Sequence, residues 1–484
     1  MRPRPAMAGT ARKAFVLTTL ALVVVLSLAL GGRAHRPINP PLAQNRSNNE
    51  QRFEGLERRR GEHQDLVILA FSGGGTRAAA FSYGVLEALR DIEVPASGGG
   101  KTRMLDEVDV ITGVSGGSFT ALGYGLYGDK LFDVLESGFL KRDVQGTLIR
   151  RMLNPRNWLA LWSGGWGRSE LAAQLYDEIL FHGATFADLE RAGGPLIAVS
   201  ATELTSGARV VFLPQNFDVM CADLDAFKLS RAAAASSAVP VVLSPVTINN
   251  YGGSCGYRAP SWLKAFSEQS HPPRPAGRVL KRLQELKQLD DASEDRYFHL
   301  IDGAVSDNLG LRGVLDYIEA FEALRLAGQP TPLDHVRRII VFVVNSASYP
   351  SFAWNETEKS PAAASILVKA AGVPVDRYAS ESIELLKDID ARWTALRAIR
   401  DSAAFDKAKD ASLSWVGYVP NADIYAIEVS FQMLTDAKER DYLNQLPTSF
   451  ALPPEAVDRL RAAAKKIVSS SPEVQQILNA SRRE

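Results

Sequence analysis

The segment Asp109-Val110-Ile111-Thr112-Gly113-Val114-Ser115-Gly116-Gly117-Ser118-Phe119 decides the fold of this chain. It holds a G-x-S-x-G pattern between an apolar run, Val108–Thr112, which predicts a buried strand, and a helical pattern over Phe119–Tyr127. Small neighbours allow a sharp turn on which Ser115 adopts a strained backbone conformation. These neighbours are Gly113, Gly116 and Gly117. The strand-turn-helix context is typical of a nucleophile elbow, in which the serine hydroxyl lies at a helix N-terminus.

A second glycine-rich turn lies upstream, between a strand expected over Leu66–Phe71 and a helix expected over Ala78–Arg90. Its residues are Ser72-Gly73-Gly74-Gly75-Thr76-Arg77. Backbone N–H groups in such a loop turn toward one point, so Gly73, Gly74 and Gly75 are predicted to bind an anion beside the positive end of the helix. The anion is either a phosphate or the oxyanion of an acyl-transfer intermediate, and the alternative is a tight turn that binds nothing. A Walker phosphate loop is excluded because no Gly-Lys-Ser/Thr closes the segment.

An aspartate follows an apolar strand far downstream, in Tyr297-Phe298-His299-Leu300-Ile301-Asp302-Gly303-Ala304. Because the carboxyl ends of parallel strands form one crevice, Asp302 is predicted to meet Ser115 there, with Gly303 supporting the turn. Taken alone, Asp-Gly after a strand also fits a plain turn.

The histidines argue against a Ser-His-Asp triad. The chain has six, namely His35, His63, His182, His271, His299 and His335. His335 precedes the strand expected over Arg338–Val344 and His63 precedes the first strand, so both lie at the opposite end of the sheet from the crevice. His299 is three residues before Asp302 on one strand, and the two side chains should point to opposite faces. The sequence therefore favours a Ser/Asp dyad, in which the carboxylate alone takes the serine proton.

Apolar runs alternate with helical patterns through most of the chain. Further strands are predicted at Leu196–Ala201, Val210–Leu213, Ile339–Val344 and Ile424–Val429, and further helices at Glu170–Leu180 and Val457–Val468. This alternation predicts an α/β fold with a mostly parallel central sheet covered by helices on both faces.

Together these motifs resemble those of the patatin-like phospholipases. The family's G-G-G-x-R matches Gly73, Gly74, Gly75 and Arg77, its G-x-S-x-G matches Gly113 to Gly117, its D-G-A/G matches Asp302 to Ala304, and a further block before a proline matches Ala235 to Pro240. The resemblance covers Leu66–Leu309 in motif order and implies a three-layer α/β/α sandwich.

The resemblance also implies a lipid acyl hydrolase of the phospholipase A or lysophospholipase type, acting on membrane phospholipid or another acyl lipid. Asp302 would deprotonate Ser115, the glycine loop would hold the oxyanion, and water would release the fatty acid from an acyl-serine. Arg77 either orients the glycine loop, meets a lipid phosphate or forms a surface salt bridge. An acyltransferase on the same dyad and a non-catalytic lipid-binding protein are the alternatives. No cofactor or metal is expected, because the histidines show no ligand spacing.

The first 34 residues are expected to lie outside the fold. Basic residues precede a charge-free apolar run, Ala14–Gly32, which would span about 28 Å as a helix. The run fits either a cleaved signal peptide or a retained membrane anchor. Either one would place the catalytic domain outside the cytoplasm, periplasmic or anchored to the membrane.

Four further segments are predicted. Residues 35–64 are expected to form an exposed linker, and 65–345 a catalytic core interrupted near 261–296 by a surface insertion. Residues 346–484 are expected to form a C-terminal α/β extension packed on the core, without a recognised functional motif.

The charge and cysteine content of the chain limit the kinds of molecule that it is expected to bind. Lys and Arg number 55 against 55 Asp and Glu, so no basic field favours a nucleic acid. Cys221 and Cys255 suffice for one disulfide, which the sequence does not decide, and are too few for a cysteine zinc site.

Aromatic and basic residues gather in one stretch after the elbow. Residues Arg150–Arg168 hold three of the seven tryptophans and four arginines. Trp158 and Trp162 would share a helix face, and Trp prefers the membrane interface while Arg prefers anionic headgroups. The segment is predicted to be a lid or membrane-docking surface, and the alternative is a buried aromatic cap over the sheet.

Overall fold

The computed structural model describes residues 36–481, apart from 45–63, 97–98, 163–165, 241, 260–276, 350–352, 357, 359, 404 and 406–410. The expected signal or anchor, most of the predicted linker and the first part of the insertion lie outside the described residues. Within the described residues, no helix has the length and apolar character needed to cross a bilayer.

The central sheet of the described chain has eight strands. Seven form the order β10-β9-β1-β4-β5-β8-β7, and β6 pairs with β5. Their bounds are β1 (Asp65–Phe71), β4 (Val108–Val114), β5 (Leu196–Glu203), β6 (Arg209–Val211), β7 (Val246–Asn249), β8 (Tyr297–Ile301), β9 (Arg338–Asn345) and β10 (Asp423–Ser430). The strands from β10 to β5 are parallel, whereas β6, β7 and β8 are antiparallel to their neighbours. A small hairpin of β2 (Glu93–Pro95) and β3 (Lys101–Arg103) stands apart.

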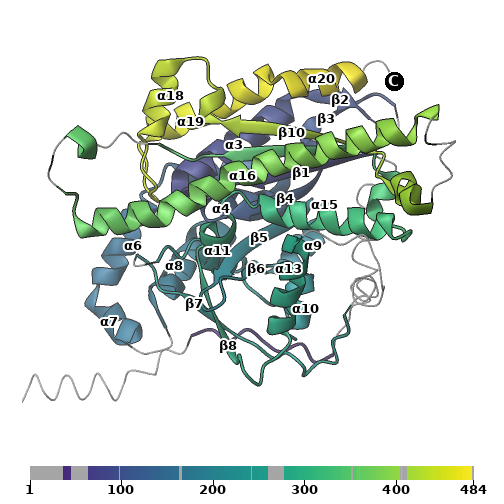
Figure 1. Cartoon of the computed structure of the whole chain (residues 1–484). Coiled ribbons are helices and arrows are strands. Elements are labelled where there is room, and N and C mark those ends of the chain that lie inside the picture. Colours follow the sequence, from purple (N-terminus) through teal and green to yellow (C-terminus); the bar gives the residue numbers. More distant parts are fainter. Residues whose placement is uncertain are drawn as a thin grey trace, which may run out of the picture.

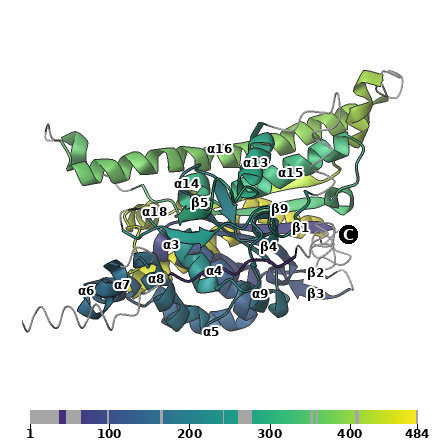
Figure 2. The same ribbon diagram turned by 90° about the horizontal axis from the view of Figure 1, so that it is seen from below.

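Helices cover both faces of the sheet, as Figures 1 and 2 show. One face carries α3 (Gly75–Asp91), α4 (Gly116–Tyr127), α8 (Arg168–Tyr176), α11 (Leu229–Ser236) and α19 (Pro454–Ser470). The other carries α15 (Leu311–Leu326) and α16 (Ala363–Arg400). The remaining α-helices are α5 (Leu131–Leu135), α6 (Val144–Leu153), α7 (Pro155–Trp162), α9 (Phe186–Ala192), α10 (Pro214–Val219), α13 (Gly277–Leu289), α14 (Ala304–Asp307), α18 (Ala437–Asn444) and α20 (Pro472–Ser481). The predicted three-layer α/β/α sandwich with a mostly parallel sheet is confirmed.

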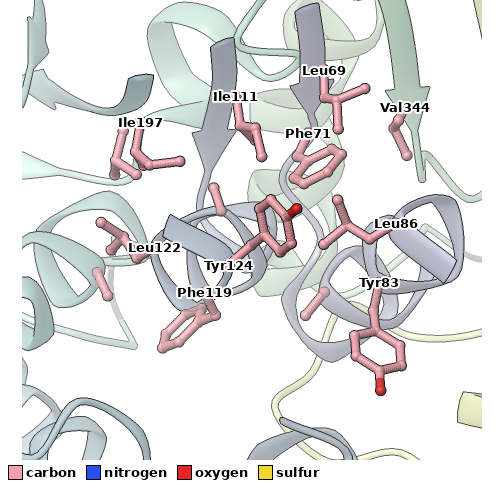
Figure 3. Packing of buried hydrophobic residues seen from close by; sticks show 14 of the residues in the cluster. Leu69, Phe71, Tyr83, Leu86, Ile111, Phe119, Leu122, Tyr124, Ile197 and Val344 are labelled. Carbon is pink, nitrogen blue, oxygen red and sulfur yellow. The ribbon is translucent and has the colours of Figure 1, made fainter. Parts of the chain in front are cut away.

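The sequence of β1 explains the two cores. Val67, Leu69 and Phe71 point to the layer of α3 and α4, and Ile68 and Ala70 point to the layer of α15 and α16. Side chains alternate along a strand, so a central strand with helices on both faces must be apolar at every position. Figure 3 shows Leu69 and Phe71 packed with side chains from α3, α4 and the neighbouring strands.

The C-terminal region completes the sheet. β10 pairs in parallel with β9 from Asp423↔Arg338 to Ser430↔Asn345. On the outer face, α19 packs along α3 over most of its length. A Cβ on Gly84 of α3 would collide with the backbone of Arg461, so this glycine allows the two helices their close approach.

The start of the predicted linker is bound to the core. Asn39 is 2% exposed, and its side chain exchanges two hydrogen bonds with the backbone of Asn249 at the end of β7. The backbone N–H of Leu42 donates to the carbonyl of Cys221. Asn39 is therefore buried rather than exposed as predicted, because its side chain pairs with the backbone as a neighbouring strand would, whereas Pro37, Ile38 and Pro41 are exposed.

The helical half of the predicted insertion also contacts the core. α13 packs on α10 and α15 and buries Val279 and Leu289. Arg282 of α13 donates to the carbonyl oxygen of Arg209 on β6 at 2.5 Å. This helix is thus joined to the sheet edge beside β6.

Candidate active site

Ser115 forms the turn between β4 and α4. Its backbone angles are φ 48° and ψ −118°, a combination that non-glycine residues rarely adopt and that costs about 1–3 kcal/mol. The glycines around it permit backbone-to-backbone packing. A Cβ on Gly117 would lie 2.7 Å from the carbonyl oxygens of Phe71 and Ser72, and one on Gly116 would collide with the carbonyl of Gly75. The elbow therefore packs directly on the glycine loop. Gly113, whose Cβ would lie 2.9 Å from that of Ala121, lets α4 fold back on β4.

The structure brings Ser115 and Asp302 together. The Ser115 hydroxyl donates to Oδ2 of Asp302 at 2.8 Å, and Oδ1 of Asp302 accepts from the N–H of Ala304 at 2.9 Å. Both residues are buried, with 4% and 5% of their surfaces exposed. The contact joins the end of β4 to the end of β8.

The expected reason for this meeting is wrong, since β8 is not parallel to its neighbour. It runs antiparallel to β5 and pairs with it only through Leu300 and Ile301, opposite Glu203 and Thr202. The two strands overlap only at their carboxyl ends. The carboxyl end of β8 therefore lies at the carboxyl end of β5, and Asp302, which follows β8, still lies in the crevice. Gly303 follows because a Cβ there would collide with the carbonyl oxygen of Ser200 on β5.

Burial sets the proton affinity of Asp302. Removal from water raises the pKa of this carboxyl to about 6, although hydrogen bonds from Ala304 and Ser115 act in the opposite direction. The group is therefore ionised at neutral pH, yet close enough to its pKa to accept and return a proton.

One segment holds both members of the dyad. Ser236 Oγ accepts from the N–H of Ser115 at 2.9 Å and donates to the carbonyl of Ser200 at 2.7 Å. The carbonyl of Ala238 accepts from the N–H of Asp302 at 3.0 Å. These residues belong to the block Ala235–Pro240 noted in the sequence. No motif assigned a role to Ser236, whose side chain holds the strained elbow by binding the backbone N–H of Ser115.

The glycine loop lies against the nucleophile. A Cβ on Gly73 would lie 3.3 Å from Cβ of Ser115. The N–H of Gly73 donates to the carbonyl of Asn308 at 2.9 Å, so the prediction of Gly73 as an oxyanion donor is wrong. Within the described residues, the N–H groups of Gly74 and Gly75 donate no hydrogen bond. With φ of 139° and 60°, they are the loop donors left for an anion at the start of α3.

Arg77 supports the loop from behind. It is 3% exposed, and its guanidinium donates to the carbonyls of Ser346 and Leu446 at 2.8 and 2.7 Å and to the hydroxyl of Thr448 at 3.0 Å. Burial lowers the pKa of Arg77 to about 10, an effect that the nearby Asp376 carboxylate partly offsets. The surface salt bridge is therefore wrong, and the contacts match the predicted alternative of orienting the loop rather than meeting a phosphate.

The C-terminal region supplies contacts that the sequence did not indicate. Ser346, just after β9, donates from Oγ to the carbonyl of Gly73 at 2.9 Å. The carbonyl of Ser449 accepts from the N–H of Thr76 at 2.9 Å. Backbone carbonyls leave no sequence signature. Ser346 could have been found, because it follows the carboxyl end of a central strand.

The histidines within the described residues lie away from the dyad. His299 is exposed on β8 and its Nδ1 contacts Thr247 Oγ1 at 2.9 Å. His335 ends a short 3-10 helix before β9, at the opposite end of the sheet. His182 is exposed after the π-helical turn that follows α8. His35, His63 and His271 lie outside the described residues.

The tryptophan segment is divided between surface and interior. Trp158 of α7 is 54% exposed, whereas Trp166 is buried. The side chain of Trp162 lies outside the described residues. Ile149 and Leu153 on α6, which precedes α7 in the sequence, are exposed apolar side chains as well.

Cys221 and Cys255 form a disulfide. The ring that it closes contains Ser236 and Ala238, the two residues that hold the dyad. Across the described part of the chain, no three His, Cys, Asp or Glu side chains gather in a way that would hold a metal ion.

Comparison with known proteins identifies the class as lipid hydrolases. A model of patatin-like phospholipases matches residues 69–315, just over half of the chain. The chain belongs to the patatin-like phospholipase family. No curated protein matches the sequence.

Solved structures give more distant similarity. Human GIVD cytosolic phospholipase A2 shares 13% identity at a TM-score of 0.43, over 92% of this chain and 66% of that one. Its complex with methyl gamma-linolenyl fluorophosphonate shares 14% at 0.40, over 91% of this chain and 64% of that one. The type III effector protein ExoU shares 15% at 0.20, over 83% and 78%. The chain thus spans just under two thirds of the cytosolic phospholipase A2 chain.

Proposed function

We propose that this protein hydrolyses acyl lipids of the phospholipase A or lysophospholipase type through an acyl-serine on a Ser115-Asp302 dyad. The observation that carries the proposal is the 2.8 Å hydrogen bond from the Ser115 hydroxyl to the Asp302 carboxylate, at an elbow beside a glycine loop. A nucleophile and base within hydrogen-bond reach are what acyl transfer requires.

Acylation forms one bond and breaks another. As Ser115 Oγ bonds to the acyl carbonyl carbon, its proton passes to Asp302. The tetrahedral intermediate then collapses, the bond to the leaving alcohol breaks, and Asp302 returns the proton to that alcohol oxygen. A carboxyl pKa near 6 suits both transfers at neutral pH.

Deacylation repeats the sequence with water. Asp302 takes a proton from the attacking water, the serine ester bond breaks, and the proton returns to Ser115 Oγ as the fatty acid leaves. In both halves the N–H groups of Gly74 and Gly75 would hold the oxyanion, and the positive end of α3 would add to them. Arg77 and Ser346 would keep the loop in position without touching the reacting atoms.

Two alternative functions differ from hydrolysis in the fate of the serine. An acyltransferase would use the same dyad and replace water by an acceptor alcohol. A non-catalytic lipid-binding protein would need neither the strained serine nor the buried aspartate, and the presence of both in contact favours catalysis.

Membrane phospholipid is the proposed substrate, and α6 and α7 the proposed membrane contact. Leu153, Trp158 and Ile149 are 67%, 54% and 48% exposed. Arg150 and Arg156 lie among them and would meet anionic headgroups.

The catalytic domain is proposed to lie outside the cytoplasm, either periplasmic or anchored to the membrane. The apolar run Ala14–Gly32 supports it, and so does the Cys221–Cys255 disulfide, because disulfides persist in oxidising compartments.

Product analysis tests the proposed reaction. Phospholipid labelled in each acyl chain would be incubated with wild-type and Ser115→Ala protein, with and without an acceptor alcohol. Free fatty acid from the wild type alone supports hydrolysis, and acyl transfer to the alcohol at the expense of fatty acid supports the transferase. Equal products from both proteins would contradict a serine mechanism.

A further inference from the structure

The helix α16 has two unequal halves. From Ala379 onward it buries one stripe of side chains in the core under β9 and β10. They are Ala379, Ile383, Leu386, Ile389 and Trp393. Between Ala363 and Tyr378 no described side chain is buried. Pro374 lies where the stripe stops, and it lacks the N–H that a helical hydrogen bond requires.

The first half of α16 is nevertheless apolar in sequence. Residues 363–378 read AASILVKAAGVPVDRY, and Ile366, Val373 and Tyr378 are 47%, 37% and 49% exposed. In Figures 1 and 2 this end of α16 reaches past the sheet on the side where α6 and α7 lie. Ile366 and Val373 are seven residues apart and therefore lie on the same side of the helix, where they form a candidate binding surface.

This half ends next to the dyad. α16 contacts α14, which starts two residues after Asp302. A small hollow between the two helices is lined by Val305, Asn308, Val375 and Tyr378. The guanidinium of Arg312 stacks on the Tyr378 ring at 4.7 Å. Val305 is itself 48% exposed, so exposed apolar side chains continue from α14 onto α16.

We propose that the first half of α16 forms a bilayer-docking face whose C-terminal end lies beside the dyad, which deepens and rests on the proposed function. Ser115 is 4% exposed, so a phospholipid has to leave the bilayer and enter the protein to reach it. Ile366 and Val373, flanked by Lys369 and Arg377 on the same helix, suit acyl chains below phosphate headgroups. A second copy of the chain is the competing occupant.

The test uses two changes in the unburied half and one matched control. Ile366→Ser with Val373→Ser removes the apolar contact, and Ile399→Ser alters an equally exposed (51%) isoleucine at the far end of the same helix. All are made in Ser115→Ala protein for cosedimentation with vesicles of phosphatidylcholine and phosphatidylglycerol, and in active protein for turnover of vesicle lipid and of a short soluble ester.

The double variant is expected to bind vesicles with an affinity lowered about tenfold or more, and to cleave vesicle lipid more slowly by a similar factor. Soluble-ester turnover and melting temperature should stay near wild type, and Ile399→Ser should change nothing. Unchanged vesicle binding would overturn the proposal. So would equal loss with Ile399→Ser, loss on the soluble ester, or a dimer that the double variant splits without losing vesicle binding. Wild-type protein that docks through α16 but cleaves no ester would contradict the proposed function alone.

Discussion

Ser236 Oγ lies 2.9 Å from the backbone nitrogen of Ser115, which makes it the acceptor for the N–H of the nucleophile. In many serine hydrolases an N–H at the elbow faces the oxyanion. Here the N–H of Ser115 itself is already bonded to Ser236, so it is not available to an oxyanion. The same serine also ties the elbow to β5 through the Ser200 carbonyl, which holds a strained residue in place.

Removing that tie should impair catalysis. Ser236→Ala leaves the Ser115 N–H and the Ser200 carbonyl without their partner, and we expect kcat to fall about 10- to 100-fold with KM nearly unchanged. The adjacent Ser237 is equally buried, but its hydroxyl donates to the carbonyl of Ala233 in α11 and interacts with the Tyr176 hydroxyl rather than with the elbow nitrogen. Ser237→Ala should keep kcat within about threefold. Equal losses in the two variants would argue that the segment matters only for folding.

The glycine loop should tolerate no side chain at Gly74. A Cβ there would lie 2.8 Å from Ser346 Oγ, and φ of 139° disfavours any other residue. Gly74→Ala should lower kcat about 100-fold or more, because a displaced oxyanion donor costs about 2.7–4 kcal/mol in the transition state. Gly207→Ala is the control, since Gly207 also has positive φ but open space around it. If Gly74→Ala were no slower than this control, the loop would not bind the oxyanion.

Activity should depend on a carboxylate that titrates near pH 6. Asp302 accepts a proton only when ionised, and burial raises its pKa to about 6. We expect kcat/KM for a soluble ester to fall tenfold per pH unit below that value and to level off above it. A pH-rate profile from 4.5 to 8.5 measures this. A flat profile through pH 5 to 7 would contradict Asp302 as the base.

The same raised pKa has a consequence for stability. The folded state binds the Asp302 proton more tightly than the unfolded state, so this contribution is complete below about pH 4 and is lost as pH rises through about 6. Asp302→Asn, which has no charge to bury, should therefore melt above wild type at pH 8 and close to it at pH 4.5. The upper bound on the difference is roughly 3 kcal/mol. Thermal melts at the two pH values measure it, and a lower melting temperature at pH 8 would contradict the buried charge.

Membrane binding should depend on α7. Trp158→Ala with Trp162→Ala should weaken liposome binding and slow hydrolysis of vesicle lipid, while a short soluble ester is cleaved at the normal rate. Tyr418→Ala, at a similarly exposed aromatic residue before β10, should have no effect. Equal loss on both substrates, or a protein that no longer folds, would favour the buried aromatic cap.

The sequence predicted the parts of the fold whose signals are local. Val67–Phe71 of β1 and Ile339–Val344 of β9 are apolar at every position because helices cover both faces, and the glycines at the elbow are required by backbone contacts. The direction of β8 could not be predicted, because an apolar run has the same pattern in either orientation. The four-residue β7, which is half-buried, was too short to give a clear pattern and was missed.

The sequence predicted the catalytic side chains of the site, but it did not predict the backbone contacts that hold them in place. Ser115 and Asp302 meet as the motifs indicated, although β8 is antiparallel to β5. The partners of Arg77, in contrast, are mostly backbone carbonyls after Val344. The bond from Gly73 to Asn308 depends on how α14 packs, which one sequence does not reveal. Asn39 was assigned to a linker because its contact with β7 is non-local.

The central claim is that Ser115 and Asp302 act as one catalytic unit. The most direct test measures hydrolysis of a short soluble ester by Ser115→Ala, Asp302→Asn and the double variant, with circular dichroism as the check on folding. We predict that each single variant loses about 10⁴-fold or more, that the double variant is no worse than either, and that all three remain folded. A folded Ser115→Ala protein with full activity, or losses that multiply in the double variant, would contradict the dyad.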